Sequence, residues 1–185
     1  MTINALRLPA HSFVKRLIGA ALLDARIYEE VEADRSAIGQ AALVVLLSSM
    51  AAGIGARGFG ASRPVDVVFF AAVALGGWIA WAALIYQIGA RLFPAPQTNA
   101  DIGQLLRTIG FATTPGLLRV LGVLPGLTAS VFAITSLWML VAMIVGVRQA
   151  LDTQTRHAVV VCTVGWVLAL ALAVGLGVLF GPDVQ

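Results

Sequence analysis

Three observations predict an all-α, polytopic integral membrane protein: the composition, the length of the apolar runs, and an amphipathic stretch that precedes them. Of the 185 residues, 59% are hydrophobic and 11% are charged, which is too little polar surface to cover a soluble domain. A run of about 20 apolar residues is enough to cross a bilayer as a helix. We predict an N-terminal cytoplasmic segment with an amphipathic helix over residues 1–35 and a domain of five transmembrane helices over residues 36–185.

The first predicted element is an amphipathic helix over residues 11–34, which is too charged to span a membrane. Its apolar residues recur at steps of three and four, as one face of a helix requires. They are Val14, Leu17, Ile18, Ala21, Leu22, Ala25 and Tyr28. Two placements remain open: the helix lies on the membrane surface with Lys15 and Arg16 at the lipid headgroups, or its stripe packs against the protein's own bundle.

Four strongly apolar segments follow, over residues 37–56, 65–90, 126–147 and 158–180. At 1.5 Å per residue each is long enough to cross about 30 Å of hydrocarbon. The only charge inside them is Asp66, at an edge. A fifth and weaker candidate, residues 103–124, contains Arg107 and Arg119, which we expect to extend toward headgroups on opposite sides.

This fifth candidate contains the stretch GFATTPGLLRVLGVLPG, residues 110–126, with two prolines and four glycines. A proline removes one helical hydrogen bond, but a membrane helix tolerates this when a hydroxyl group or a neighbouring helix takes up the freed carbonyl. Thr113 and Thr114 lie beside Pro115 and can supply such bonds. We predict a crossing helix kinked near Pro115 and a tight turn over residues 124–126. The kink serves either packing alone or a hinge or ligand-lined site.

The basic residues favour a cytoplasmic N-terminus and a C-terminus on the opposite side. If all five segments cross, nine of the twelve Lys and Arg residues fall on the cytoplasmic side, as the positive-inside rule expects. These nine are Arg7, Lys15, Arg16, Arg26, Arg35, Arg91, Arg107, Arg148 and Arg156. If residues 103–124 did not cross, Arg148 and Arg156 would move outside and weaken the bias.

The sequence offers little for catalysis or metal binding. The two histidines, His11 and His157, have no ligand partner by spacing, and the single cysteine, Cys162, lies in an apolar run where a small core residue is expected. No titratable base lies in the middle of a span, so we expect no enzyme, no metal and no cofactor. The basic residues are scattered without interleaved aromatic residues, which gives no support for nucleic-acid binding.

The last apolar segment has a small residue at every fourth position. The residues are Gly165, Ala169, Ala173, Gly177 and Gly181. Such a stripe lets another helix approach closely. That helix belongs either to the same chain or to a second membrane protein, which includes another copy of this one.

The order of these parts resembles the bacterial branch of the Ypt-interacting-protein (Yip) domain family. The resemblance extends from about Phe13 to the last span, and its most specific residues are Gly110, Phe111, Thr114 and Pro115. It implies five spans with a cytoplasmic N-terminus, in the bacterial inner (cytoplasmic) membrane. Eukaryotic relatives are associated with small Rab-type GTPases and vesicle traffic. The long cytoplasmic region that they place before the spans is reduced here to about 35 residues, so we do not extend that role to this chain.

These features favour a non-enzymatic membrane scaffold or accessory protein that binds membrane lipids, other membrane proteins or both. The alternative is a small permease or channel-like transporter. In that case the kinked helix over residues 103–124, the third span along the chain, lines the path. Its polar candidates are Gln40, Gln87, Thr113 and Thr114.

Overall fold

The computed structural model is all-α and describes residues 11–57, 64–98 and 100–180. The elements are α1 (Phe13–Ala21), α2 (Ala25–Ala33), η1 (Arg35–Ala37), α3 (Ile38–Arg57), α4 (Pro64–Tyr86), η2 (Gln87–Leu92), α5 (Ile102–Ala112), η3 (Thr114–Val123), α6 (Thr128–Ala150) and α7 (Thr155–Phe180). Four stretches are long and apolar enough to cross a membrane: Arg35–Ala56, Val67–Leu92, Thr128–Ala150 and Thr155–Leu172. This confirms that the four strongly apolar segments form helices long enough to cross a membrane, as expected for a polytopic membrane protein.

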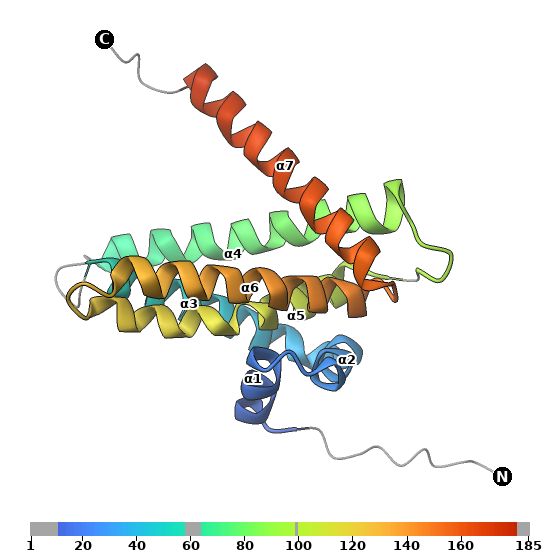
Figure 1. The fold of residues 1–185 in the computed structure, drawn as a ribbon, viewed down its shortest axis with the longest axis horizontal. Coiled ribbons are helices and arrows are strands. Elements are labelled where there is room, and N and C mark those ends of the chain that lie inside the picture. The colour runs from blue at the N-terminus through green and yellow to red at the C-terminus, as the bar shows by residue number, and fades with distance from the viewer. Residues whose placement is uncertain (1–10, 58–63, 99, 181–185) are drawn as a thin grey trace.

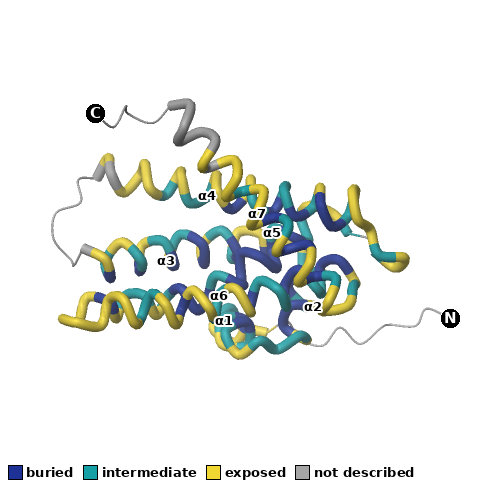
Figure 2. The backbone as a smooth tube through the Cα atoms, turned by 45° about the horizontal axis from the view of Figure 1, so that its top comes forward, coloured by how far each residue is buried: buried dark blue, intermediate teal, exposed yellow. Residues whose placement is uncertain are grey.

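The long helices α3, α4 and α6 run side by side along the longest axis of the molecule (Figure 1). The 3₁₀ segment η3 packs between α3 and α6, and α4 packs on α3 and α5. The buried core lies at one end of this bundle, where α2, α5 and the adjoining ends of α4 and α6 meet (Figure 2). Elsewhere the helices expose large apolar side chains such as Val68 and Phe69, as expected for surfaces that face lipid.

The N-terminal segment corrects one prediction, because residues 11–34 form two short helices and not one. The helix α1 ends at Ala21, and Leu23 adopts a left-handed backbone conformation with φ of 63°. Asp24 then caps α2 by accepting a hydrogen bond of 3.0 Å from the backbone N–H of Arg26. This turn gives the two helices different directions, so the predicted stripe is divided between two surfaces.

Residues 103–124 differ from the regular helices. The helix α5 ends at Ala112, and the chain continues as a 3₁₀ helix over Thr114–Val123. The predicted tight turn follows: the N–H of Leu127 donates to the carbonyl of Leu124 at 3.1 Å, and Gly126 has a φ of 79° that favours glycine. Neither α5 nor η3 alone is long enough to count as a span.

Candidate functional site

The break between α5 and η3 is stabilised by its own threonines. Pro115 has no N–H, so the carbonyl of Phe111 loses the helical donor four residues ahead. The hydroxyl of Thr114 donates to this carbonyl at 2.6 Å, and the hydroxyl of Thr113 donates to the carbonyl of Gly110 at 2.7 Å. The sequence therefore carries, beside the proline, the donors that its backbone needs.

Two glycines bring this segment close to its neighbours. A Cβ atom on Gly110 would lie 2.7 Å from the Cβ of Ala41 in α3. A Cβ atom on Gly116 would lie 2.1 Å from the hydroxyl oxygen of Ser48 in α3 and 3.0 Å from the sulfur of Met139 in α6. All three distances are well inside van der Waals contact, so the break is held against α3 and α6 by residues without side chains.

Phe111 joins the break to the N-terminal segment. Its side chain is fully buried and meets the ring of Phe13 edge to face, with 6.4 Å between the ring centroids. Thr114 and Pro115 are also buried. Gly110, Phe111, Thr114 and Pro115 of the predicted motif therefore lie in the interior, where α1, α3 and the broken helix meet, and Thr113 is half-buried.

Arg107 caps a helix and does not face lipid headgroups, which corrects the headgroup prediction for this residue. Its side chain is 6% exposed, and its Nε donates to the carbonyls of Val31 and Glu32, each at 3.0 Å, near the end of α2. A cation there also complements the negative end of the helix dipole. Beside it, the side-chain amide of Gln104 donates to a carboxylate oxygen of Glu32 at 2.8 Å.

Arg16 corrects the same prediction, since only 2% of the residue is exposed. Its guanidinium donates to Glu30 at 2.9 Å, to Asp34 at 2.7 Å and to the side-chain oxygen of Gln40 at 3.0 Å. Burial lowers the pKa of Arg16, but the hydrogen bonds to the two carboxylates outweigh it and raise that pKa above its ordinary value. His11 also pairs with Glu30. We refer to Arg16, Glu30, Asp34 and Gln40 as the Arg16 cluster.

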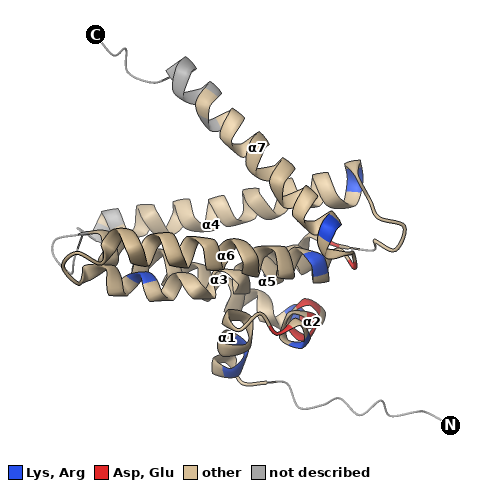
Figure 3. Cartoon of the chain, in the orientation of Figure 1, with Lys and Arg blue, Asp and Glu red and all other residues tan. Residues whose placement is uncertain are grey.

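Glu32 is a carboxylate of this region whose environment opposes its charge. Burial is the main cause, and repulsion from Asp152 and Glu29 adds to it, against the opposing effect of Arg107. Together they raise the pKa of Glu32 to about 7. The charged residues of α1, α2 and the turn between α6 and α7 gather at this end of the bundle (Figure 3).

The two remaining headgroup candidates differ from each other. Lys15 is exposed on α1. Arg119, on η3, donates to the hydroxyl of Ser136 at 2.8 Å and to that of Thr135 at 3.3 Å, and its guanidinium lies 5.3 Å from the ring centroid of Phe132. Arg119 therefore bonds to α6, which leaves Lys15 as the candidate whose charge is free to meet lipid.

A family model of the Yip1 domain matches residues 24–176, which is most of the chain. The chain belongs to the Yip1 domain family. Proteins of this family are not enzymes, and the Yip family takes part in membrane trafficking. No curated protein and no solved structure matches the chain.

Part of the site lies inside the matched Yip1 domain and part lies before it. The match begins at Asp24, the residue that caps α2, so α1 with Arg16 precedes the domain. Gly110, Phe111 and Pro115 lie inside it. The Yip1 domain of this chain therefore contains the broken helix, while α1 is an element packed onto it from outside the match.

The small-residue stripe of the last helix begins inside the Yip1 domain. Gly165 is buried, and a Cβ atom there would lie 2.9 Å from the Cδ1 of Ile85 in α4. Ala169 is half-buried. The side chains of Ala173 and Gly177, and the whole of Gly181, fall outside the described residues. The described part of the stripe thus passes from an internal contact to a more open surface.

The polar residues that would line a permeation path are separated by the structure. Gln40 belongs to the Arg16 cluster, and Thr113 and Thr114 bond to the backbone of their own helix. Gln87 is exposed on η2, in another part of the Yip1 domain. Within the described ranges no three metal-ligating side chains of His, Cys, Asp or Glu gather. Cys162 is buried, as its apolar surroundings predict.

Proposed function

We propose that this non-enzymatic Yip1-domain membrane protein is a scaffold that binds other membrane proteins through the outer part of α7. Family membership supports an interaction with membrane proteins in general. The observation that carries the proposal is the exposure of α7 beyond Gly165. Trp166, Val167, Leu168, Leu170 and Leu172 are all exposed. Because successive helical residues point about 100° apart, these side chains leave most of the circumference of this part of α7 uncovered, apart from the side of half-buried Ala169 and the contact between Trp166 and Trp81. Figure 1 shows α7 diverging from the bundle.

The stripe gives that exposed helix a face on which a partner helix fits. Small residues let two backbones approach closely, and the contact is favoured by dispersion that lipid tails match poorly. Gly165 is buried in the protein's own core, and Ala169, the next residue of the stripe, is half-buried. A second membrane helix, from another protein or another copy, is the partner that this chemistry fits.

Photo-crosslinking in native membranes tests the proposal. A crosslinker at Val167 or Leu170 is expected to give protein adducts, whereas one at Val68, equally exposed on α4, gives lipid adducts. Ala169→Phe should remove the adducts and leave the melting temperature of the purified protein unchanged. Gly165→Leu is the control for an internal contact and should lower the melting temperature, because Gly165 packs against Ile85. Adducts that are the same at Val68 and Val167 would contradict the scaffold.

We further propose that α5 and η3 together form a fifth crossing, with the N-terminus in the cytoplasm. At about 1.5 Å per α-helical residue and about 2.0 Å per 3₁₀ residue, they extend roughly 36 Å, enough for the hydrocarbon core. The charge distribution of the whole sequence favours the same arrangement.

Cysteine accessibility separates five crossings from four. Gln97, before α5, and Leu127, after η3, are both exposed. With five crossings, Gln97→Cys labels from the cytoplasmic side and Leu127→Cys from the opposite side. With four crossings both label from one side. Transport of a solute by the purified protein in liposomes, without any partner, would favour the permease instead.

A further inference from the structure

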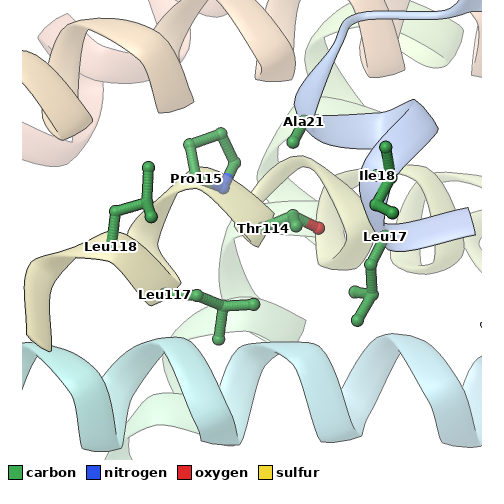
Figure 4. A pocket seen from close by; sticks show the side chains of 7 residues that line it. All are labelled: Leu17, Ile18, Ala21, Thr114, Pro115, Leu117 and Leu118. Carbon is green, nitrogen blue, oxygen red and sulfur yellow. The ribbon is translucent and has the colours of Figure 1, made fainter. Parts of the chain in front are cut away.

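The outward face of α1 is apolar and continuous with a groove. Val14, Ile18 and Leu22 lie along one side of the helix and are 60%, 55% and 71% exposed. The groove beside them has a volume of about 210 Å³. Its lining residues are Leu17, Ile18 and Ala21 of α1 and Thr114, Pro115, Leu117 and Leu118 of η3, as Figure 4 shows.

The charged residues of α1 lie away from the centre of its outward apolar face. Arg16 points to the opposite side of α1 and is held in the Arg16 cluster by two carboxylates. Lys15 is exposed and lies on the edge of the apolar face that is farther from the groove, given about 100° between successive residues. An amphipathic helix that lies in the membrane interface has this pattern, with an apolar face toward the acyl chains and a basic residue at the rim.

The neighbouring element supports the same location. The groove's second wall is η3, which lies between two candidate membrane spans, α3 and α6. In Figure 1, α1 runs across the direction of those spans, as a helix lying in the plane of a membrane would. The groove is smaller than the roughly 300 Å³ of a pocket for a whole drug-sized ligand, so it suits one stretch of a chain.

We propose that α1 lies within the membrane leaflet next to α5 and that the groove between α1 and η3 holds a phospholipid acyl chain. The bilayer covers Val14, Ile18 and Leu22, and Lys15 reaches the headgroup phosphates. This inference adds a lipid site to the proposed scaffold and rests on the fifth crossing, which places η3 in the bilayer. It assigns a site to α1, which precedes the matched Yip1 domain.

Depth-dependent quenching tests the position of α1 in liposomes. In a Cys162→Ala background, Ile18→Cys and Lys15→Cys each carry the same fluorophore and form a matched pair on one helix. Lipids with a spin label on the acyl chain are expected to quench the probe at residue 18 more strongly, and lipids with a headgroup spin label the probe at residue 15. Equal quenching at both positions, or a probe at residue 18 shielded from both lipid labels and aqueous iodide, would overturn the proposal, because water or protein would then cover this face.

A groove-filling variant tests the acyl-chain site. A phospholipid with a photoreactive acyl chain should label the peptides that contain Ile18 and Leu118. Ala21→Phe fills the groove and should reduce this labelling roughly tenfold, the expected effect of excluding about two methylene groups. Ala133→Phe places the same ring on an exposed position of α6 and should not change it. Labelling that persists in Ala21→Phe would overturn the site.

The two proposals fail in different ways. If the fifth crossing is wrong, Gln97→Cys and Leu127→Cys label from the same side. If the topology holds and only the lipid site is wrong, those two positions label from opposite sides while Ala21→Phe has no effect on lipid labelling.

Discussion

Single residues show that two arginines organise the N-terminal end of the molecule. Arg16 binds side chains of α2 and α3, and Arg107 binds backbone carbonyls of α2. Both are almost fully buried. Removing a buried charge that is paired leaves its partners without compensation, which is more costly than losing a surface pair. The N-terminal helices are therefore attached to the bundle by polar contacts as well as by apolar packing.

Replacing Arg16 by Ala is expected to destabilise the protein by on the order of 2 kcal/mol, below the full cost of a broken buried pair because Glu30 and Asp34 retain some contact with solvent. The measurement is thermal unfolding in detergent. Arg26→Ala is the matched control and should change little, since among the described residues the Arg26 side chain pairs only with Asp24, at an exposed position. Equal effects of the two substitutions would contradict the role of the Arg16 cluster.

Glu32 predicts a pH dependence of stability. Its folded-state pKa of about 7 lies above the ordinary value of 4.5, so the folded protein binds a proton that the unfolded chain has released between these values. Its contribution to stability is therefore present at about pH 4 and is lost as the pH rises through about 7. Melting temperatures measured from about pH 5 to about pH 8 should fall, and Glu32→Gln should flatten the profile. A profile unchanged by the substitution would show that another group is responsible.

At the scale of elements, run length identifies the four long apolar helices, whereas the breaks within the shorter helical segments are only partly predictable. A helix that crosses the hydrocarbon core needs about 20 consecutive apolar residues, and such long runs are easily recognised in the sequence. The break at Pro115 is visible because proline has a fixed chemistry. The break at Leu23 is not, since a non-glycine residue with positive φ is uncommon and leaves no signal in the apolar pattern.

Close packing of η3 on α3 predicts an unequal response to two neighbouring glycines. A Cβ atom on Gly55 would lie 1.9 Å from the backbone oxygen of Arg119, whereas one on Gly53 would meet nothing within 4 Å. Gly55→Ala must therefore move η3 and should cost about 1–3 kcal/mol. Gly53→Ala, two residues away on the same helix, should be neutral or stabilising. Thermal unfolding of the two variants side by side gives the comparison, and similar melting temperatures would contradict this packing.

At the scale of the whole molecule, the candidate site was predictable in its residues but not in its surroundings. The motif from Gly110 to Pro115 stands out in the sequence because its breakers interrupt an apolar run. Its contact with Phe13 depends on residues about a hundred positions apart, which no local pattern encodes. The sequence places Arg16 on the polar side of one continuous helix, whereas the turn at Leu23 brings Glu30 of α2 and Asp34, which follows α2, into contact with it.

The link between the N-terminal helices and α6 predicts the behaviour of incomplete chains. The indole N–H of Trp138 donates to the carbonyl of Ala21 at 2.8 Å, and Gln149 donates to the carboxylate of Glu29 at 2.9 Å. A nascent chain stalled after residue 127 lacks both donors. Protease should then cleave near residues 22–24, while the full-length protein resists. Equal resistance of the two chains would show that α1 and α2 dock without α6.

This link sets an order for assembly during synthesis. The helices that leave the ribosome first have their hydrogen-bond partners on a helix that is made more than a hundred residues later. Until α6 has been made, α1 and α2 can bind only elements made earlier, such as α3 and α5, through Gln40 and Arg107. The contacts of α1 and α2 are therefore complete only once α6 is in place.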